Sequence, residues 1–195
     1  MQIRRVRNET DSMRRFVEEL WLPYHRDLEA AVNSHAMADE VDVDDVVEFR
    51  TEYFDDPSRR LWVALDDIDD STHTLPETDA TFAGFLGTSL KTPPAKFETA
   101  DQLHLGNFYV DPAYRGTGLA DDLITRAIQH AREDGAVALS LQVDVDNDRA
   151  LAYYEKLGFD VAKYRMQVPL EEVRADVDSR HNWIPDPSRV DHAEI

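Results

Sequence analysis

Apolar residues recur along the chain in two patterns, one typical of strands and one typical of helices. Short apolar runs bounded by polar, glycine or proline residues predict strands over residues 1–7, 60–65, 81–90, 103–110, 137–143 and 159–168. Apolar residues spaced three or four apart predict helices over about residues 12–22, 42–54, 116–134 and 148–157. Pro23 is expected to kink or end the first of these helices.

The spacing of the strands indicates how they pair. Strands 81–90 and 103–110 are separated by one loop, so an antiparallel hairpin is the simplest connection. Gly84 and Gly87 in the first of them suggest a bulge or the close approach of another backbone. The helix at 116–134 lies between strands 103–110 and 137–143, which predicts a βαβ unit with a parallel pair. The prediction is an α/β (α+β) chain with a mixed sheet.

Residues 115–120 read Arg-Gly-Thr-Gly-Leu-Ala and join the strand at 103–110 to the next helix. A helix that begins after such a loop presents unsatisfied N–H groups and the positive end of its dipole, which suits a bound phosphate. A tight turn into a core helix explains a single glycine-rich loop equally well. On these residues alone, both interpretations stay open.

A second segment changes that balance. Residues 147–159 read Asn-Asp-Arg-Ala-Leu-Ala-Tyr-Tyr-Glu-Lys-Leu-Gly-Phe. With Val110-Asp111-Pro112 and the glycine loop before it, this segment resembles the GNAT superfamily of acetyl-CoA-dependent N-acetyltransferases. The resemblance covers roughly residues 1–168, and its specific motifs lie within residues 103–159. It implies the acyl-CoA N-acyltransferase fold, a mixed central sheet with helices on both faces.

The resemblance also implies how acetyl-CoA is held, with the cosubstrate between strands 103–110 and 137–143. Val110 matches the position whose backbone N–H bonds the thioester carbonyl, and a fixed donor there would stabilise the oxyanion. Asn147 matches the asparagine that contacts pantetheine, a role compatible with capping the following helix. The pyrophosphate would be held by the backbone amides of Arg115, Gly116, Thr117, Gly118, Leu119 and Ala120.

Two side chains are candidates for proton transfer. Tyr154 matches the family tyrosine that protonates the departing thiolate, although its helical spacing also fits a core tyrosine, and Tyr153 is the second choice. His104 lies six residues before Val110 on the predicted strand, hence on the same face, and is the candidate general base. Asp101 and the absence of any side-chain base are the alternatives.

The charge balance is unusual: 40 acidic residues stand against 21 basic ones, for a net charge of −19. This predicts an acidic surface adapted to high salt and a halophilic source. An acidic site that attracts a cationic substrate such as a polyamine is the alternative. Nucleic-acid binding is disfavoured because the sequence has no basic cluster. The chain has no cysteine, which excludes disulfides and thiolate metal ligands, and no metal site is predicted.

The length favours one domain, residues 1–169, followed by an acidic extension, residues 170–195. We expect a cytoplasmic protein without membrane association, because no apolar stretch has the length of a membrane span or a secretory signal. The expected reaction is direct attack of a small-molecule or peptide amine on acetyl-CoA in a ternary complex. The alternative is a non-catalytic acyl-CoA-binding or sensing module. A homodimer rests on family analogy alone.

Overall fold

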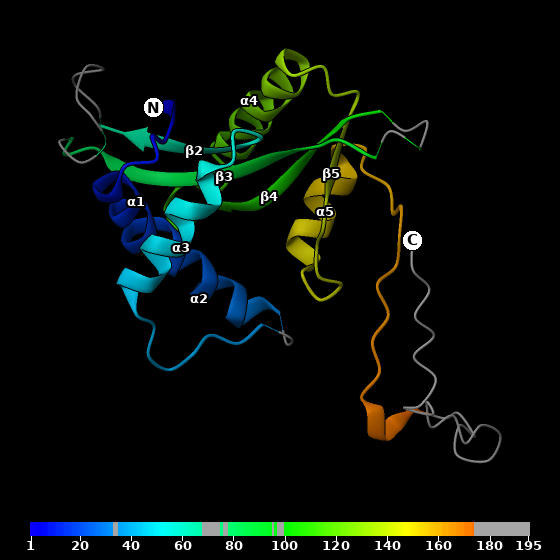
Figure 1. Ribbon diagram of the computed structural model, residues 1–195. Coiled ribbons are helices and arrows are strands. Elements are labelled where there is room, and N and C mark those ends of the chain that lie inside the picture. The colour runs from blue at the N-terminus through cyan, green and yellow to red at the C-terminus, as the bar shows by residue number, and fades with distance from the viewer. Residues whose placement is uncertain (33–34, 68–74, 76–77, 95, 97–99, 174–195) are drawn as a thin grey trace, which may run out of the picture. The chain divides into compact units, whose positions relative to one another are not determined.

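A computed structural model describes residues 1–32, 35–67, 75, 78–94, 96 and 100–173 of the chain (Figure 1). By its internal contacts the chain divides into two units, Met1–Tyr154 and Glu155–Ile195. The predicted residues 174–195 of the acidic extension lie outside the described part. No helix in the described part combines the length and the apolar character that crossing a bilayer requires.

The first unit is built on a five-stranded sheet with the order β1-β2-β3-β4-β5. The first four strands pair antiparallel with their neighbours, and β4 pairs parallel with β5. This confirms the mixed sheet, the hairpin and the parallel pair predicted from the sequence. The strands are β1 (Gln2–Arg5), β2 (Arg59–Asp66), β3 (Thr81–Lys91), β4 (Gln102–Val110) and β5 (Ala138–Leu141).

Helical segments connect these strands. Before β2 come α1 (Thr10–Phe16), the π-helical turn η1 (Val17–Trp21), α2 (Leu22–Ala31) and α3 (Val43–Asp55). After β4 come the 3-10 turn η2 (Pro112–Tyr114), α4 (Leu119–Glu133) and α5 (Asp148–Lys156), and the second unit adds the 3-10 turn η3 (Leu170–Glu172). Pro23 does not end the helix: it lies in the first turn of α2, directly after the π-helical turn, where a missing N–H costs little.

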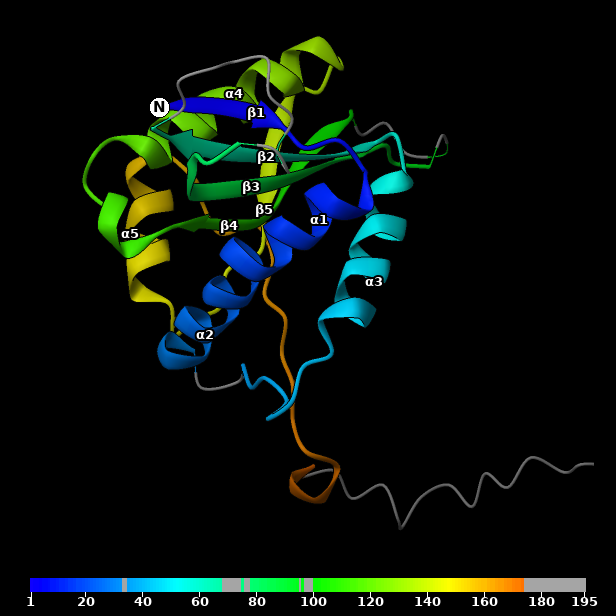
Figure 2. The ribbon, with the colours of Figure 1, turned by 90° about the vertical axis from the view of Figure 1, so that its left-hand side faces the viewer.

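Helices cover both faces of the sheet (Figure 2). On one face α1, η1 and α3 pack on β2 and β3, and the ring of Phe16 meets that of Phe85 edge-on at 4.9 Å. On the other face α4 buries Leu123 and Ala127, and His130 Nδ1 lies 3.0 Å from Thr88 Oγ1 of β3. The continuous buried runs of β2 and β3 therefore have side chains packed on both faces of the sheet.

A β-bulge divides β4 into two parts. Leu105 pairs with Thr88, but Phe108 pairs with Leu86, so two residues of β4 lie opposite Gly87 alone. A Cβ on Gly106 would come within 3.3 Å of the Gly87 carbonyl oxygen, and one on Gly84 within 2.6 Å of that of Tyr109. Both glycines are therefore sites of close backbone approach, as the sequence suggested for β3.

The strand predicted over residues 159–168 is not formed. The structure assigns no helix or strand to residues 159–169. Alternating apolar residues favour extended backbone, but a strand needs a partner for its N–H and C=O groups. Likewise β5 covers only four residues of the seven predicted, since β4 offers it a partner only from Gln102 to Leu105.

Candidate functional site

Beyond the bulge, the edge of β4 that faces away from β3 carries backbone N–H groups that pair with no strand in the described part of the chain. Asp111 N–H donates to the Ala83 carbonyl at 3.0 Å, and Tyr109 pairs with Phe85. Because successive N–H groups of a strand point to opposite edges, those of Phe108 and Val110 point away from β3. The parallel pairing with β5 stops at Leu105. Val110 is predicted from the sequence and Phe108 is not, although the N–H groups of both point to this edge.

The glycine loop continues directly from this edge. The Asp111 side chain accepts from Ala113 N–H at 2.9 Å and fixes the turn that follows β4. Gly116 and Gly118 have φ of 77° and 93°, and a Cβ on either would meet no atom within 4 Å. Glycine is therefore favoured at both positions because of the left-handed backbone conformation, and not because a side chain would be crowded. Thr117 Oγ1 donates to the Tyr114 carbonyl at 2.7 Å and closes the loop.

Gly118 is the N-cap residue of α4, and no side chain among the described residues caps that end. The first N–H groups of the helix are therefore open to a ligand, and the dipole favours an anion. Asp121 and Asp122 stand in the same first turn. Their charges oppose a phosphate there.

The side chain of Arg115 faces away from the loop and links three elements. Its Nε donates to the Val110 carbonyl at 3.1 Å, and its guanidinium pairs with Asp27 of α2 at 2.7 Å. Arg149 of α5 pairs with the same carboxylate at 2.9 Å. Asp27 thus ties α2 to both predicted cofactor-binding segments, a connection that no sequence spacing indicated.

The two tyrosines of α5 lie beside Phe108 and differ in their contacts. Tyr153 OH donates to Asp121 Oδ1 at 3.0 Å, and burial together with that bond raises the pKa of Tyr153. The ring of Tyr154 lies 6.5 Å from that of Phe108, and burial, with a smaller effect of Tyr24, raises the pKa of Tyr154. A phenol with a raised pKa keeps its proton at neutral pH, as a general acid must.

Asn147 occupies the N-cap position of α5. Its Oδ1 accepts from Ala150 N–H at 3.2 Å, and its carbonyl accepts from Leu151 N–H at 3.0 Å. The capping role considered for Asn147 is therefore observed, and contact with CoA stays a prediction.

His104 does not share a face with Val110, and that expectation was wrong. His104 lies opposite Ser89 and Ser140, in the part of β4 that β5 still covers. The extra residue at the bulge reverses the alternation, so Val110 faces α4 and His104 faces the opposite side. Six residues of strand also separate them by about 20 Å. Burial, and the charge of Lys91, lower the pKa of His104. Asp101 lies farther still along the chain from Val110.

Comparison with known proteins adds an independent finding. A family model described as "Acetyltransferase (GNAT) family" matches residues 16–159. A mycothiol acetyltransferase of Corynebacterium efficiens is 51% identical over 51 residues, which are 26% of this chain and 17% of that protein. An N-alpha-acetyltransferase of Arabidopsis thaliana is 48% identical over 50 residues, 26% of each chain. The matched segments thus span about a quarter or less of these relatives.

Similarity in structure extends further than similarity in sequence. A crystal structure of a Bacillus halodurans protein superimposes with a TM-score of 0.68 and 19% identity, covering 87% of this chain and 99% of that one. At this identity the likeness concerns the fold alone.

Proposed function

Since the chain belongs to the acetyltransferase (GNAT) family, we propose that it is an N-acetyltransferase that moves the acetyl group of acetyl-CoA to a primary amine by direct attack in a ternary complex. The observation that carries this proposal is the continuity between the open edge of β4 and the glycine loop. Fixed N–H donors for a carbonyl oxygen are followed, a few residues later, by the open start of α4.

The chain's own residues hold acetyl-CoA at two places. The N–H groups of the glycine loop, from Arg115 to Ala120, hold the pyrophosphate of acetyl-CoA, and Asn147 lies near its pantetheine. The N–H of Val110, with that of Phe108 as neighbour, holds the thioester oxygen and stabilises the charge that develops there. The amine nitrogen bonds to the acetyl carbon while the carbon–sulfur bond breaks.

Tyr154 donates its phenolic proton to the departing thiolate in this proposal. Tyr153 is less suited, because its proton already bonds Asp121. We do not assign the base to His104 or Asp101, given where β4 places them. The amine attacks in its neutral form. After the attack its nitrogen loses a proton to solvent, and the phenolate of Tyr154 takes a proton back from solvent. The proposed domain is residues 1–169, with residues 170–195 as an extension.

The test is release of free CoA thiol from acetyl-CoA with a panel of amines, in concentrated salt. We expect thiol release to match the amount of acetylated amine, with intersecting lines in double-reciprocal plots and no acetylated enzyme by mass spectrometry. Clear CoA binding without thiol release for any amine would instead support a non-catalytic acyl-CoA-binding module. Parallel lines with an acetylated protein would contradict direct attack.

A further inference from the structure

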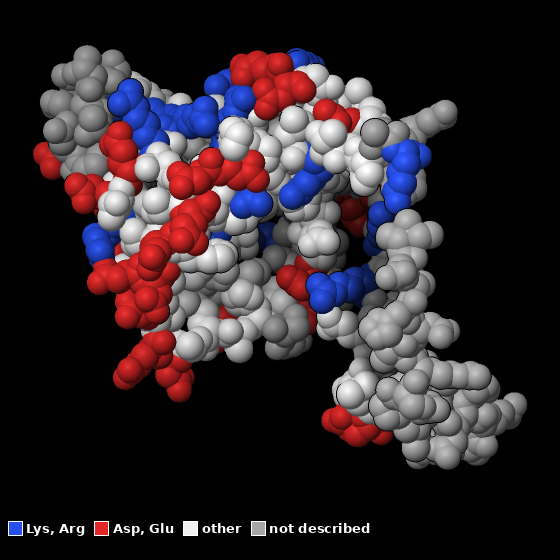
Figure 3. Space-filling view, in the orientation of Figure 1, with Lys and Arg blue, Asp and Glu red and all other residues white. Residues whose placement is uncertain are grey.

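Arg50 of α3 is a cation without a carboxylate partner among the described residues. α3 exposes a row of acidic side chains along its outer surface (Figure 3), namely Asp44, Asp45, Glu48, Glu52 and Asp55. None of them lies three or four positions from Arg50, the spacing that would let them pair on a helix. The inward positions 46, 47, 53 and 54 are Val, Val, Tyr and Phe instead.

The guanidinium of Arg50 lies among aromatic rings. Its carbon is 5.1 Å from the ring of Trp21, 5.6 Å from Phe49 and 5.8 Å from Tyr53. Burial lowers the pKa of Arg50, from a reference value high enough that the group stays charged. Water screens a half-buried charge less, so an anion that reaches this guanidinium is attracted strongly.

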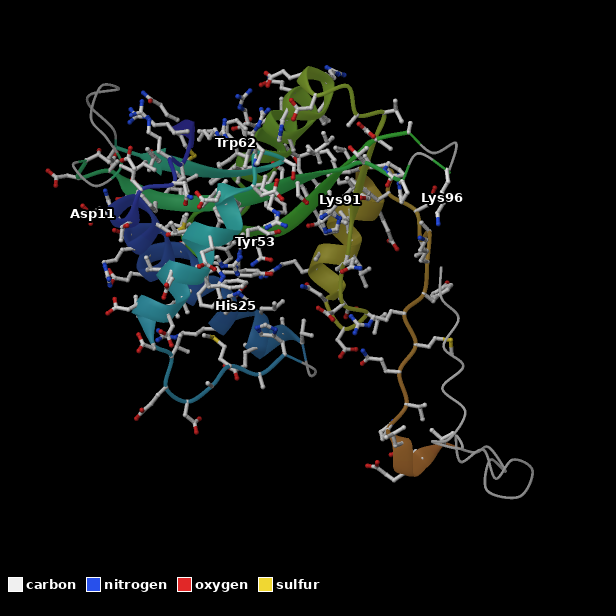
Figure 4. All side chains as sticks on the ribbon, in the orientation of Figure 1. Asp11, His25, Tyr53, Trp62, Lys91 and Lys96 are labelled. Carbon is white, nitrogen blue, oxygen red and sulfur yellow. The ribbon has the colours of Figure 1, made fainter. Side chains whose placement is uncertain are left out.

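Two more nitrogens beside Arg50 lack partners. Arg50 Nε, Trp21 Nε1 and His25 Nε2 are all buried without a hydrogen bond in the described part of the chain. The rings of Trp21 and His25 are 4.1 Å apart, and His25 Nδ1 already shares a hydrogen bond with His35 at 2.9 Å. Figure 4 shows His25 on α2 and Tyr53 on α3 with their side chains between the two helices. Buried polar atoms are nearly always paired, so these three call for an explanation.

Tyr24 connects this group to the candidate site. Its ring lies 5.9 Å from that of Tyr109, the residue between the two open N–H groups of β4. The charge of Arg50 lowers the pKa of Tyr24 and that of Asp144 raises it, although burial has the largest effect and raises it. Tyr24 is thus within electrostatic reach of Arg50, Asp144 and Tyr154.

We propose that Arg50, with the ring nitrogens of Trp21 and His25, binds an anionic group of the acceptor, so that the acceptor is an amine that also carries a carboxylate or a phosphate. This rests on the proposed acetyltransferase function. An anion on Arg50 would accept hydrogen bonds from Arg50 Nε and Trp21 Nε1, and from His25 Nε2 in the tautomer that carries a proton there. Tyr24, whose ring lies against that of Tyr109, connects this anion to the open edge of β4. The acceptor is then not a polyamine, which the acidic composition alone suggested.

The experiment compares acceptors in matched pairs, one member with the anionic group and one without. Phenylalanine with phenethylamine tests a carboxylate, and glucosamine 6-phosphate with glucosamine tests a phosphate. For the wild-type protein we expect at least a tenfold higher kcat/KM for the anionic member of one pair. Preference for the neutral member in both pairs, or for spermidine over every anionic acceptor, would overturn the proposal.

Variants test Arg50 itself. Arg50→Gln should abolish that preference by raising the KM of the anionic acceptor at least tenfold, with the KM of acetyl-CoA and the kcat for the neutral amine unchanged. Arg50→Lys should restore part of it. Arg14→Gln, at an exposed arginine that pairs with Asp44 and Glu18, is the control and should change neither. An undiminished preference in Arg50→Gln would contradict the proposal.

A binding measurement separates this proposal from the proposed function. If no amine releases thiol, the acetyltransferase function fails, and thermal unfolding with each compound still tests the anion site. An anionic compound that raises the Tm of the wild type but not of Arg50→Gln would support the site. No rise with either anionic compound, or an equal rise in both proteins, would overturn it.

Discussion

Tyr153 and Tyr154 are adjacent phenols on α5, and the hydroxyl of Tyr153 donates to Asp121, which makes the two residues a matched pair for mutation. Tyr154→Phe should lower kcat by about a hundredfold or more, because general acid catalysis contributes that much. The Kd of acetyl-CoA should change less than about twofold, since Phe keeps the contact with Phe108. Stopped-flow thiol release and calorimetric titration measure the two quantities.

The control is Tyr153→Phe, which removes only the hydrogen bond to Asp121. It should retain most of kcat. If Tyr154→Phe loses CoA affinity with unchanged turnover, or if Tyr153→Phe is the slower variant, the assignment of the acid is wrong.

His104→Gln should leave kcat/KM within about twofold of the wild type, because a base must lie within hydrogen-bond reach of the amine. The bulge places His104 on the opposite face of β4 from Val110. A pH–rate profile provides the measurement. Loss of an ionisation from the acidic limb of that profile, together with a large fall in kcat/KM, would restore His104 as the base.

His25 predicts how stability depends on pH. Its pKa is lowered to about 4 by burial and by the neighbouring His35 and Arg50, whereas the unfolded chain has a histidine pKa of about 6.5. Between these values the unfolded state binds more protons, so stability falls as pH drops from about 6.5 toward about 4. After allowance for solvent screening the loss should be about 1–2 kcal/mol.

Urea unfolding of the wild type and of His25→Gln at several pH values measures this effect. The difference in unfolding free energy between the two proteins should shift in favour of the variant as the pH falls through that window. Parallel pH dependences would show that His25 does not contribute.

At the scale of elements, the start of α4 is the segment on which cofactor binding depends. Gly118→Ala places a side chain at a φ of 93° and should destabilise the fold by about 1 kcal/mol. It should also weaken acetyl-CoA binding at least tenfold, because the N–H groups of the loop would be displaced. Calorimetric titration measures the affinity.

The other end of α4 offers the control. Gly135 has a φ of 73° and equal free space around a Cβ, so Gly135→Ala should cost similar stability and leave CoA affinity unchanged. Equal losses of affinity in both variants would mean that the loop acts through stability alone.

The elements themselves were largely predictable from the sequence. Long elements such as β3, β4, α3 and α4 have enough apolar positions in a regular pattern to be recognised. The bulge in β4 was not predicted, because Gly106 reads as an ordinary strand residue and only the pairing with Gly87 reveals the extra position. The prediction that His104 shares a face with Val110 was wrong for this reason. The predictions for the glycine loop and for Tyr154 did not depend on the alternation along β4.

For the whole molecule, the net charge of −19 predicts how salt affects cofactor binding. The phosphates of acetyl-CoA approach a negative protein and meet Asp121 and Asp122 at the start of α4. Salt screens this repulsion, with a Debye length of about 10 Å at 0.1 M and about 3 Å at 1 M. The KM of acetyl-CoA should therefore fall several-fold over that range.

Steady-state kinetics in potassium chloride test this, and Asp122→Asn should reduce the salt dependence. A KM that rises with salt would indicate a net attractive field at the loop. The halophilic source and the cytoplasmic location stay predictions from composition.

The bulge in β4 also affects how the residues of this strand are aligned with those of other proteins. Before Gly106, the odd-numbered residues of β4 face α4. After the bulge, the even-numbered residues face α4. An alignment with a relative must therefore include the extra residue of the bulge. Without it, every residue of β4 on one side of the bulge would be assigned to the wrong face of the sheet. A one-residue deletion at the bulge would leave a single residue of β4 opposite Gly87, and Tyr109 could keep its pairing with Phe85 and its face of the sheet. A change of one residue in the length of β4 is therefore expected at the bulge, and elsewhere in the strand it would move side chains to the other face.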